Sequence, residues 1–271
     1  CDYNEINALV IKHKEMFKPT TENQKKLGRV LVLSDSAHSF GATYQGKKCG
    51  SLTDVSVFSF HAVKNLTTAE GGAVALNLPE PFDNNEIYTY LCMYTLHGQN
   101  KDALAKTQKG NWRYDVEEPG YKCNMTDLQA AIGLVELDRY QENLDRRKQI
   151  FNAYDNAFSD YSWALTPLHT TESKVTSFHL YQLRIAGITE VQRDAIMQVI
   201  FDQDVSVNVH FLPLPTLTAY KKRGYKMDDY PETWNKYHNE ISLPVYFNLS
   251  DEQVQTVIEA VVKGVSTVLK K

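Results

Sequence analysis

A lysine, an aspartate, a histidine and a serine lie where a site built at the ends of strands would place them. Asp35 directly follows the apolar run of residues 29–34, and His38 lies three residues further on. Ser59 ends a second apolar run and precedes Lys64 by five residues. Because ligands of open α/β sheets bind beyond the carboxyl ends of the strands, we expect these four side chains to share one site.

Lys64 is the residue of this group with the most distinctive chemistry. A lysine in a partly desolvated pocket has a lowered pKa, and its neutral amine can then form a Schiff base with a carbonyl compound. Taken singly, Lys64 is more simply a solvated surface residue, Asp35 a helix cap and His38 a polar loop residue. The prediction of a site therefore depends on the four residues together and on the Gly71-Gly72 pair that follows them.

The elements that must position these residues belong to an α/β fold. Residues 29–34, 55–59 and 72–76 are short apolar runs, as expected of strands that are covered on both faces. Thr126 and Gln129 form a T-x-x-Q capping box. This pattern predicts a long helix that continues, with a break, to Phe158.

The second half of the chain predicts a smaller α+β region. Strands are expected near residues 177–185 and 205–209, around a helix that begins at Thr189. A last helix begins at Ser250, and its apolar residues recur at helical spacing, which predicts a buried face.

Composition indicates an ordinary globular protein of one large or two modest domains. Of the 271 residues, 42% are hydrophobic and 23% are charged, and the formal net charge is −4 at pH 7. The chain carries no overall positive field, which argues against nucleic acid as a partner. We divide it near residue 145, into an α/β part at residues 1–145 that carries the strand ends and a smaller α+β part at residues 146–271.

The expected location is the cytoplasm, without a membrane span. No apolar run approaches the ~20 residues that a span needs, and the start lacks the pattern of a secretory signal. The four cysteines lie far apart without a C-x-x-C pair, which indicates neither a metal site nor a dense disulfide framework. The chain opens at Cys1 without Met. The C-terminal part of a longer polypeptide explains this better than a processed, lipid-bearing N-terminus.

Two segments resemble the sugar aminotransferases of the DegT/StrS type. They are D-S-A-H-S-F-G-A at residues 35–42 and F-S-F-H-A-V-K-N-L-T-T-A-E-G-G-A at 58–73, with weaker agreement at 120–133 and 207–214. This family belongs to the pyridoxal-phosphate (PLP) enzymes of fold type I. The resemblance implies the C-terminal part of a large mixed-sheet domain followed by a small α+β domain. It further implies an N-terminal part, with a loop that holds the cofactor phosphate, that we expect to precede the residues of this sequence.

The resemblance also implies a role for each residue of the first group. Lys64 would anchor PLP covalently and move a proton during transamination. Asp35 would be a buried carboxylate that keeps the pyridine nitrogen of the cofactor protonated. His38 would bond to the phenolate oxygen of the cofactor or flank its ring, and Ser59 would donate a hydrogen bond to its phosphate.

The resemblance implies roles for three further residues, in segments that match the family less specifically. In the family the active site is shared across a homodimer, and Asn124, with Lys122 as the second choice, would reach the phosphate bound by the partner subunit. His210 would line the sugar pocket, although an ordinary strand-end histidine explains it nearly as well.

The implied function is transfer of an amino group from L-glutamate to a nucleotide-linked 4-keto-6-deoxy sugar for surface polysaccharide synthesis. One alternative is a related PLP-dependent sugar dehydratase, but those enzymes carry His where this chain has Lys64. Another is a truncated, non-catalytic paralogue that acts as a dimerisation or regulatory module. The presence of Asp35, His38, Ser59 and Lys64 together argues against that alternative.

Overall fold

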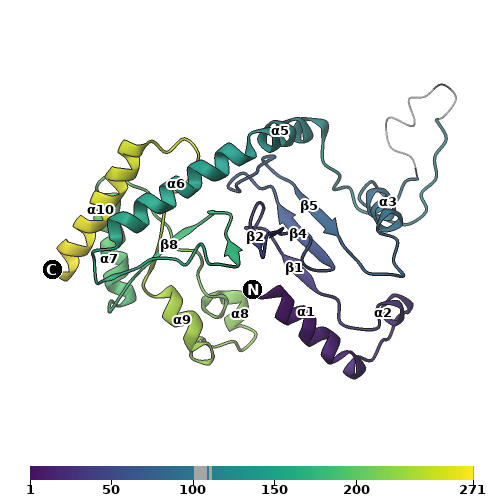
Figure 1. The fold of residues 1–271 in the computed structure, drawn as a ribbon, viewed down its shortest axis with the longest axis horizontal. Helices are drawn as coiled ribbons and strands as arrows, with labels where there is room; N and C mark the ends of the chain where they lie inside the picture. Colours follow the sequence, from purple (N-terminus) through teal and green to yellow (C-terminus); the bar gives the residue numbers. More distant parts are fainter. Residues whose placement is uncertain (101–108, 110–111, 271) are drawn as a thin grey trace. The chain divides into compact units, whose positions relative to one another are not determined.

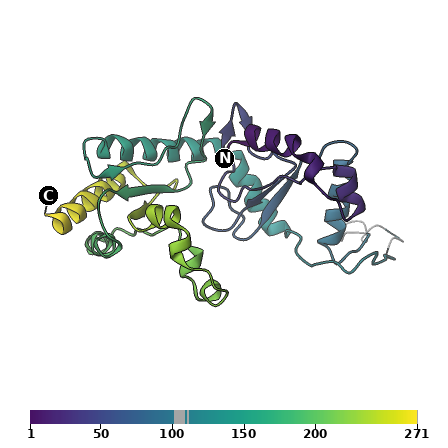
Figure 2. The ribbon, with the colours of Figure 1, turned by 90° about the horizontal axis from the view of Figure 1, so that it is seen from below.

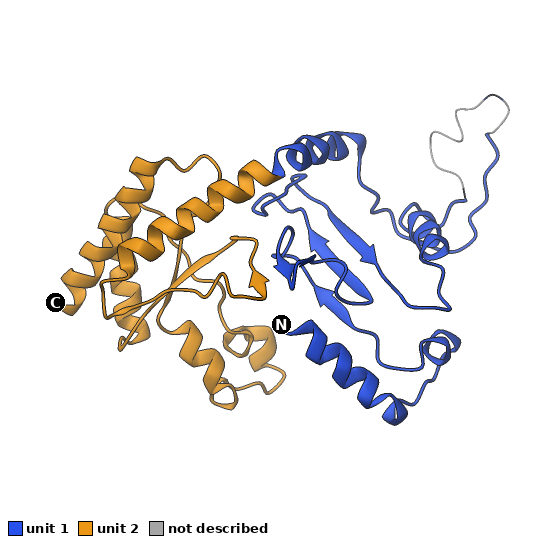
Figure 3. Cartoon of the chain, in the orientation of Figure 1, with its two compact units in different colours: residues 1–140 blue, residues 141–271 orange. Residues whose placement is uncertain are grey.

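The computed structural model describes residues 1–100, 109 and 112–270, which form two compact units (Figures 1 and 3). The first unit comprises residues 1–140 and the second residues 141–271. Both combine helices with a small sheet. Their assignment as the remainder of a PLP-binding domain and a small C-terminal domain stays a prediction.

The first unit is built on a three-stranded mixed sheet. Strand β4 (Val55–Ser59) is central, with β1 (Leu33–Asp35) parallel to it and β5 (Gly72–Leu76) antiparallel. The bounds predicted for the second and third strands are confirmed. The first strand is shorter than the apolar run that predicted it, because ladder pairing begins only at Leu33, which lies opposite Val55.

The expectation that these strands are covered on both faces is wrong for the described chain. Val32 and Ser34 are buried, whereas Leu33 between them is 57% exposed. On the buried face, the hydroxyl of Tyr3, at the start of α1 (Tyr3–Lys12), lies 2.7 Å from Ser34 Oγ, and the ring of Phe40 packs edge to face on Phe58. Successive side chains of a strand point to opposite faces, so the described residues cover one face of the sheet and leave the other open.

The remaining elements of the first unit surround this sheet (Figure 1). They are the 3₁₀ turn Lys14–Met16, α2 (Glu22–Leu27), the hairpin of β2 (Thr43–Tyr44) and β3 (Lys47–Lys48), α3 (Asn84–Tyr94) and α5 (Asp127–Asp138). The capping box of Thr126 and Gln129 is confirmed at the start of α5. The predicted break is also confirmed, since α5 ends at Asp138 and α6 spans Tyr140–Phe158.

The second unit has an antiparallel sheet in the order β6 (Ala164–Leu165), β8 (Tyr181–Ile185), β9 (Glu240–Leu243). The short strand β7 covers Lys174–Val175. Helices α7 (Glu190–Phe201) and α10 (Asp251–Leu269) pack against one another, and α10 is the yellow C-terminal helix of Figure 2. The short elements are 3₁₀ turns at Leu214–Thr216 and Met227–Asp229, α8 (Thr218–Lys221) and α9 (Pro231–Tyr237).

The core of the second unit confirms the predicted buried face of the last helix. Its buried residues recur at helical spacing, from Val254 to Val265, and Gly264 lets the backbone approach Ile196 of α7. Aromatic rings of α6 pack on Tyr181 of β8, including Phe151 with its centroid at 5.0 Å. The unit therefore has a hydrophobic core of its own.

The predicted strand at residues 205–209 is wrong. Only Asn208 pairs with the sheet, through two backbone hydrogen bonds with Ser242. Pairing does not extend back to Ser206, because in this register Ser206 would lie opposite Pro244, which has no N–H to donate. Beyond Asn208, side chains from β8 and β9 bind the backbone groups of His210. Within the described residues, no helix is long and apolar enough to cross a membrane.

Candidate active site

Lys64 lies in a loop that leaves β4 and returns to β5. Backbone hydrogen bonds join Phe60 N to Gly71 O and Thr68 N to Phe60 O, each at 2.9 Å, so the loop is closed at its base. A further bond from Lys64 N to His61 O, also 2.9 Å, forms a tight turn. The backbone of Lys64 is therefore fixed relative to the sheet, as a lysine that acts on a bound ligand requires.

Asp35 and Lys64 are electrostatic neighbours, although 29 positions separate them in the sequence. Asp35 ends β1 and Lys64 follows β4, and these two strands are parallel. Partial burial lowers the pKa of the Lys64 amine, while the charge of Asp35 raises it; burial is the larger effect, so the pKa is lowered. The site therefore favours a neutral, nucleophilic lysine more than water does.

The carboxylate of Asp35 is exposed rather than buried as the sequence analysis expects. One oxygen accepts a hydrogen bond from Ala37 N at 3.1 Å. In the alternating pattern of β1, Asp35 shares the open face of the sheet with Leu33. The described residues cover only the opposite face, which is the reason for the difference. Asp35 is thus accessible to a ligand on the open face.

Ser59 and His38 complete the group that the sequence predicts at the strand ends. Ser59 Oγ accepts a hydrogen bond from His61 N at 3.3 Å, so the hydroxyl hydrogen can donate to a ligand. His38 is half-buried in the turn after Asp35, which a bond from Ser39 N to Ser36 O closes at 3.0 Å. All four residues lie in the first unit.

Asn124 and Lys122 lie on an exposed segment just before α5. The Lys122 ammonium donates to Asn124 Oδ1, and Asn124 Nδ2 donates to Met125 O at 3.2 Å. These contacts hold the two side chains together. Their predicted role toward a partner subunit stays a prediction.

His210 lies in the second unit, on the wall of a pocket of about 650 Å³. Gln182, Arg184 and Glu240 from the sheet line the same pocket, as does Phe211. The rings of His210 and Phe211 meet edge to face, with centroids 4.8 Å apart, and a cis peptide bond joins the two residues. His210 is therefore part of a pocket, as a residue that lines a substrate site must be.

Sequence reasoning missed the threonines that brace the Lys64 loop. Thr68 is 1% exposed, and its hydroxyl donates to Glu70 O at 2.9 Å. The Thr67 hydroxyl donates to Phe60 O at 3.3 Å and accepts from Ala69 N at 3.0 Å. Two adjacent threonines in a short loop are a usable signal, because their hydroxyls bind nearby backbone groups. Gln182 and Glu240 were also missed, since no local pattern connects them with His210.

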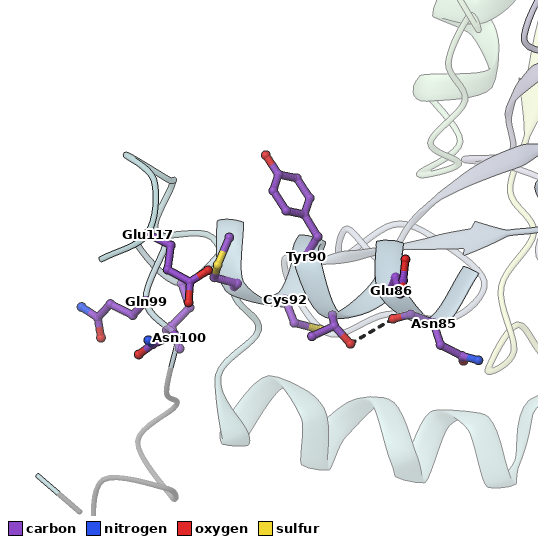
Figure 4. Close-up of a pocket in the computed structure, with 10 residues that line it drawn as sticks. Asn85, Glu86, Tyr90, Cys92, Gln99, Asn100 and Glu117 are labelled. Carbon is purple, nitrogen blue, oxygen red and sulfur yellow. Dashed lines mark hydrogen bonds between the residues drawn. The ribbon is translucent and has the colours of Figure 1, made fainter. Parts of the chain in front are cut away.

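A pocket of about 750 Å³ in the first unit contains none of the predicted residues (Figure 4). One side of α3 forms it together with Gln99, Asn100 and Glu117. The Thr89 hydroxyl donates to Asn85 O at 2.9 Å there, within the helix itself. This pocket is therefore separate from the group at the strand ends.

The fold is that of the PLP-dependent transferases of fold type I, as the sequence analysis predicts. A putative sugar aminotransferase from Streptococcus pneumoniae has a similar structure in its PMP form, with a TM-score of 0.92 and 44% sequence identity over 99% of this chain and 67% of that one. Its PLP form has a TM-score of 0.91. Helicobacter pylori PseC, an aminotransferase of pseudoaminic acid biosynthesis, has a TM-score of 0.74 and is 29% identical, over 88% of this chain and 60% of that one.

The chain belongs to the DegT/DnrJ/EryC1/StrS aminotransferase family, whose model matches residues 24–262. The spore coat polysaccharide biosynthesis protein SpsC of Bacillus subtilis is 38% identical over 87% of this chain and 60% of its own length. The UDP-4-amino-4,6-dideoxy-N-acetyl-beta-L-altrosamine transaminase of Helicobacter pylori is 31% identical over 85% of this chain and 58% of its own. The chain thus spans about 60% of these curated relatives. The family and the PLP-form structure indicate PLP as the cofactor.

Proposed function

We propose that this protein is a PLP-dependent aminotransferase that moves an amino group from L-glutamate to the keto carbon of a nucleotide-linked 4-keto-6-deoxy sugar. The observation that carries the proposal is the Lys64 amine, whose pKa is lowered at the end of β4, beside Asp35 at the end of the parallel strand β1. A lysine that must form a covalent bond with a carbonyl and then move protons needs such an environment.

Each of the four residues at the strand ends of the first unit has a separate role toward the cofactor. PLP, when bound, would supply an electron sink in its ring and an aldehyde carbon that carries the amino group between the two halves of the reaction. Lys64 holds the cofactor and, as a neutral amine, accepts and returns the proton of the substrate carbon. The negative charge of Asp35 favours the protonated pyridine nitrogen. The Ser59 hydroxyl donates to the phosphate, and His38 bonds to the phenolate oxygen or flanks the ring.

The substrate class follows from the relatives. One is a transaminase of a UDP-linked 4-amino-4,6-dideoxy sugar, and another serves spore coat polysaccharide biosynthesis. We infer a UDP-linked sugar that is aminated at C4 for a surface polysaccharide, with His210 in the sugar pocket. We further infer a homodimer, in which Asn124 contacts the phosphate bound by the partner. The cytoplasmic location that we propose accords with four cysteines that form no disulfide.

Both alternatives remain weaker than this proposal. A sugar dehydratase of the family has no use for the nucleophile that Lys64 provides. A non-catalytic module has no need for a partly desolvated lysine next to a carboxylate, because desolvation of a cation costs stability. The intact group at the strand ends therefore favours catalysis.

Borohydride trapping tests the role of Lys64 directly. The purified chain is loaded with PLP and reduced with sodium borohydride, and the peptides are mapped by mass spectrometry. We expect the cofactor mass on the peptide that contains Lys64, and no specific label in Lys64→Ala. Lys47→Ala, which removes an exposed lysine of β3, is the matched control and should label like the wild type. Label on another lysine, or on none, would contradict the assignment.

A further inference from the structure

Two side chains from neighbouring strands hold the backbone of His210 from both sides. Gln182 of β8 donates from Nε2 to His210 O at 2.6 Å. Glu240 of β9 accepts the His210 N–H at Oε2, at 3.0 Å. Both strands belong to one sheet, in which Gln182 lies opposite Ser242 and Glu240 opposite Arg184. We call Gln182 and Glu240 the His210 clamp.

The clamp binds the chain just beyond the last residue that pairs with the sheet. Asn208 makes two backbone bonds with Ser242, and no ladder continues beyond it. At His210 the two backbone groups are instead bound by side chains, which fixes the chain direction without a strand. A backbone that is bound at both its N–H and its C=O has little freedom to shift. The Cα of His210, from which the ring extends, therefore has a defined position.

Glu240 is a costly residue to use for structure alone. It is 3% exposed, and its second oxygen accepts a bond from Ser242 Oγ at 2.5 Å. Burial raises the pKa of Glu240 to about 6, against the effect of its hydrogen bonds. A buried carboxylate contributes less to stability than an apolar residue that fills the same space, so its presence beside a pocket favours a functional role.

We propose that Gln182 and Glu240 are positioning residues for the sugar half of the reaction, and that they act by holding His210 and Phe211 at the pocket of the second unit. This inference rests on the proposed function, because it takes His210 to line the sugar site. It adds two residues that do not themselves perform chemistry. It also predicts that substitution of either residue weakens the reaction with the nucleotide sugar and leaves the reaction with L-glutamate unchanged.

The two half-reactions separate this inference from the proposed function. The first is conversion of the PLP form to the PMP form by L-glutamate, and the second is the same conversion by UDP-4-amino-4,6-dideoxy-N-acetyl-beta-L-altrosamine, which runs the sugar reaction in reverse. Both are followed by cofactor absorbance in the full chain. Failure of the wild type with glutamate would overturn the proposed function and this inference with it. A wild type that reacts with glutamate leaves the clamp to be tested by its variants.

Gln182→Leu is the first clamp variant, with Gln203→Leu as its matched control. The Gln203 side chain donates to Val199 O at 2.9 Å, so both variants lose a hydrogen bond from Gln to a backbone carbonyl. For Gln182→Leu we expect the KM for the nucleotide sugar to rise about tenfold to a hundredfold, since small displacements of positioning groups have effects of this order. Glutamate constants should stay within about twofold of the wild type, and Gln203→Leu should match the wild type in both. Equal losses with both substrates, or no difference from the control, would overturn the inference.

Glu240→Gln and Glu240→Leu provide the conservative comparison. Gln keeps an oxygen that can accept the His210 N–H, whereas Leu keeps the approximate volume without an acceptor. For Glu240→Gln we expect the KM for the nucleotide sugar to stay within a few-fold of the wild-type value. For Glu240→Leu we expect this KM to rise as it does in Gln182→Leu. An equal rise of this KM in both Glu240 variants would contradict a role through the His210 bond.

The clamp can also be observed without catalysis. The chain has eight histidines, so ¹⁵N-histidine labelling gives a small set of amide signals. Groups near Glu240 that can titrate or carry charge are Arg184, Arg193, Glu232, Lys236, Tyr237 and His210. The His210 amide proton should shift as Glu240 ionises, with a midpoint at about pH 6, because its acceptor gains a charge. Glu240→Gln should remove the shift that is due to this acceptor, and an unchanged titration in Glu240→Gln would disprove the bond.

Discussion

At the scale of single residues, chemistry depends on how Asp35 and Lys64 affect one another. The sequence could place both at strand ends, because apolar runs and the polar residues that follow them are local patterns. It could not give the balance between burial and the charge of Asp35 that sets the pKa of Lys64, since that balance depends on neighbours brought together by the sheet. It also predicted a buried Asp35, whereas the described residues leave this carboxylate exposed.

Asp35→Asn tests this electrostatic coupling. The charge of Asp35 raises the pKa of Lys64, so its removal should lower that pKa further. The amine should then be neutral, and reactive, at a lower pH than in the wild type. Competitive labelling of the Lys64 amine with acetic anhydride, as a function of pH, measures the shift. Glu22→Gln removes an exposed carboxylate of α2 and serves as the control. An unchanged Lys64 profile in Asp35→Asn would show that the two groups do not interact.

At the scale of elements, the sequence predicted the strands and helices with a strong local pattern. β4, β5, the capping box of α5 and the starts of α7 and α10 after Thr189 and Ser250 are confirmed. The strand expected at residues 205–209 is wrong, because only Asn208 pairs with the sheet and Ser206 would lie opposite Pro244, which has no N–H. Alternation alone could not reveal this, since the pairing partner comes from a distant part of the sequence.

Thr68→Val tests the brace of the Lys64 loop. The substitution keeps the shape of a buried side chain but removes the hydroxyl that donates to Glu70 O. We expect a loss of about 0.5 to 1.5 kcal/mol in the free energy of unfolding of the first unit, because one part-buried hydrogen bond is removed while Glu70 O keeps the bond that it accepts from Gln129 Nε2 at 2.8 Å. Thr256→Val removes an exposed hydroxyl that donates to Glu252 O and should cost less than about 0.5 kcal/mol. Urea denaturation measures both free energies of unfolding. Equal losses in the two variants would mean that the Thr68 hydroxyl stabilises the protein no more than an exposed hydroxyl does.

At the scale of the whole molecule, the residues with predicted roles are divided between the two units. Asp35, His38, Ser59 and Lys64 lie in residues 1–140, and His210 lies in residues 141–271. The fold and the family could be predicted because the segments at residues 35–42 and 58–73 are long and correctly spaced. The role proposed for Asn124 would depend on a second subunit, and a single sequence carries no direct information about contacts between copies.

The central claim is that this protein exchanges an amino group with L-glutamate through a cofactor held by Lys64. The most direct test is the visible absorbance of the purified chain with PLP, recorded before and after addition of L-glutamate. We predict a band of lysine-bound cofactor that glutamate converts to the absorbance of the PMP form, and neither feature in Lys64→Ala. A wild-type chain that gives no such band, or a band that glutamate leaves unchanged, would contradict the account.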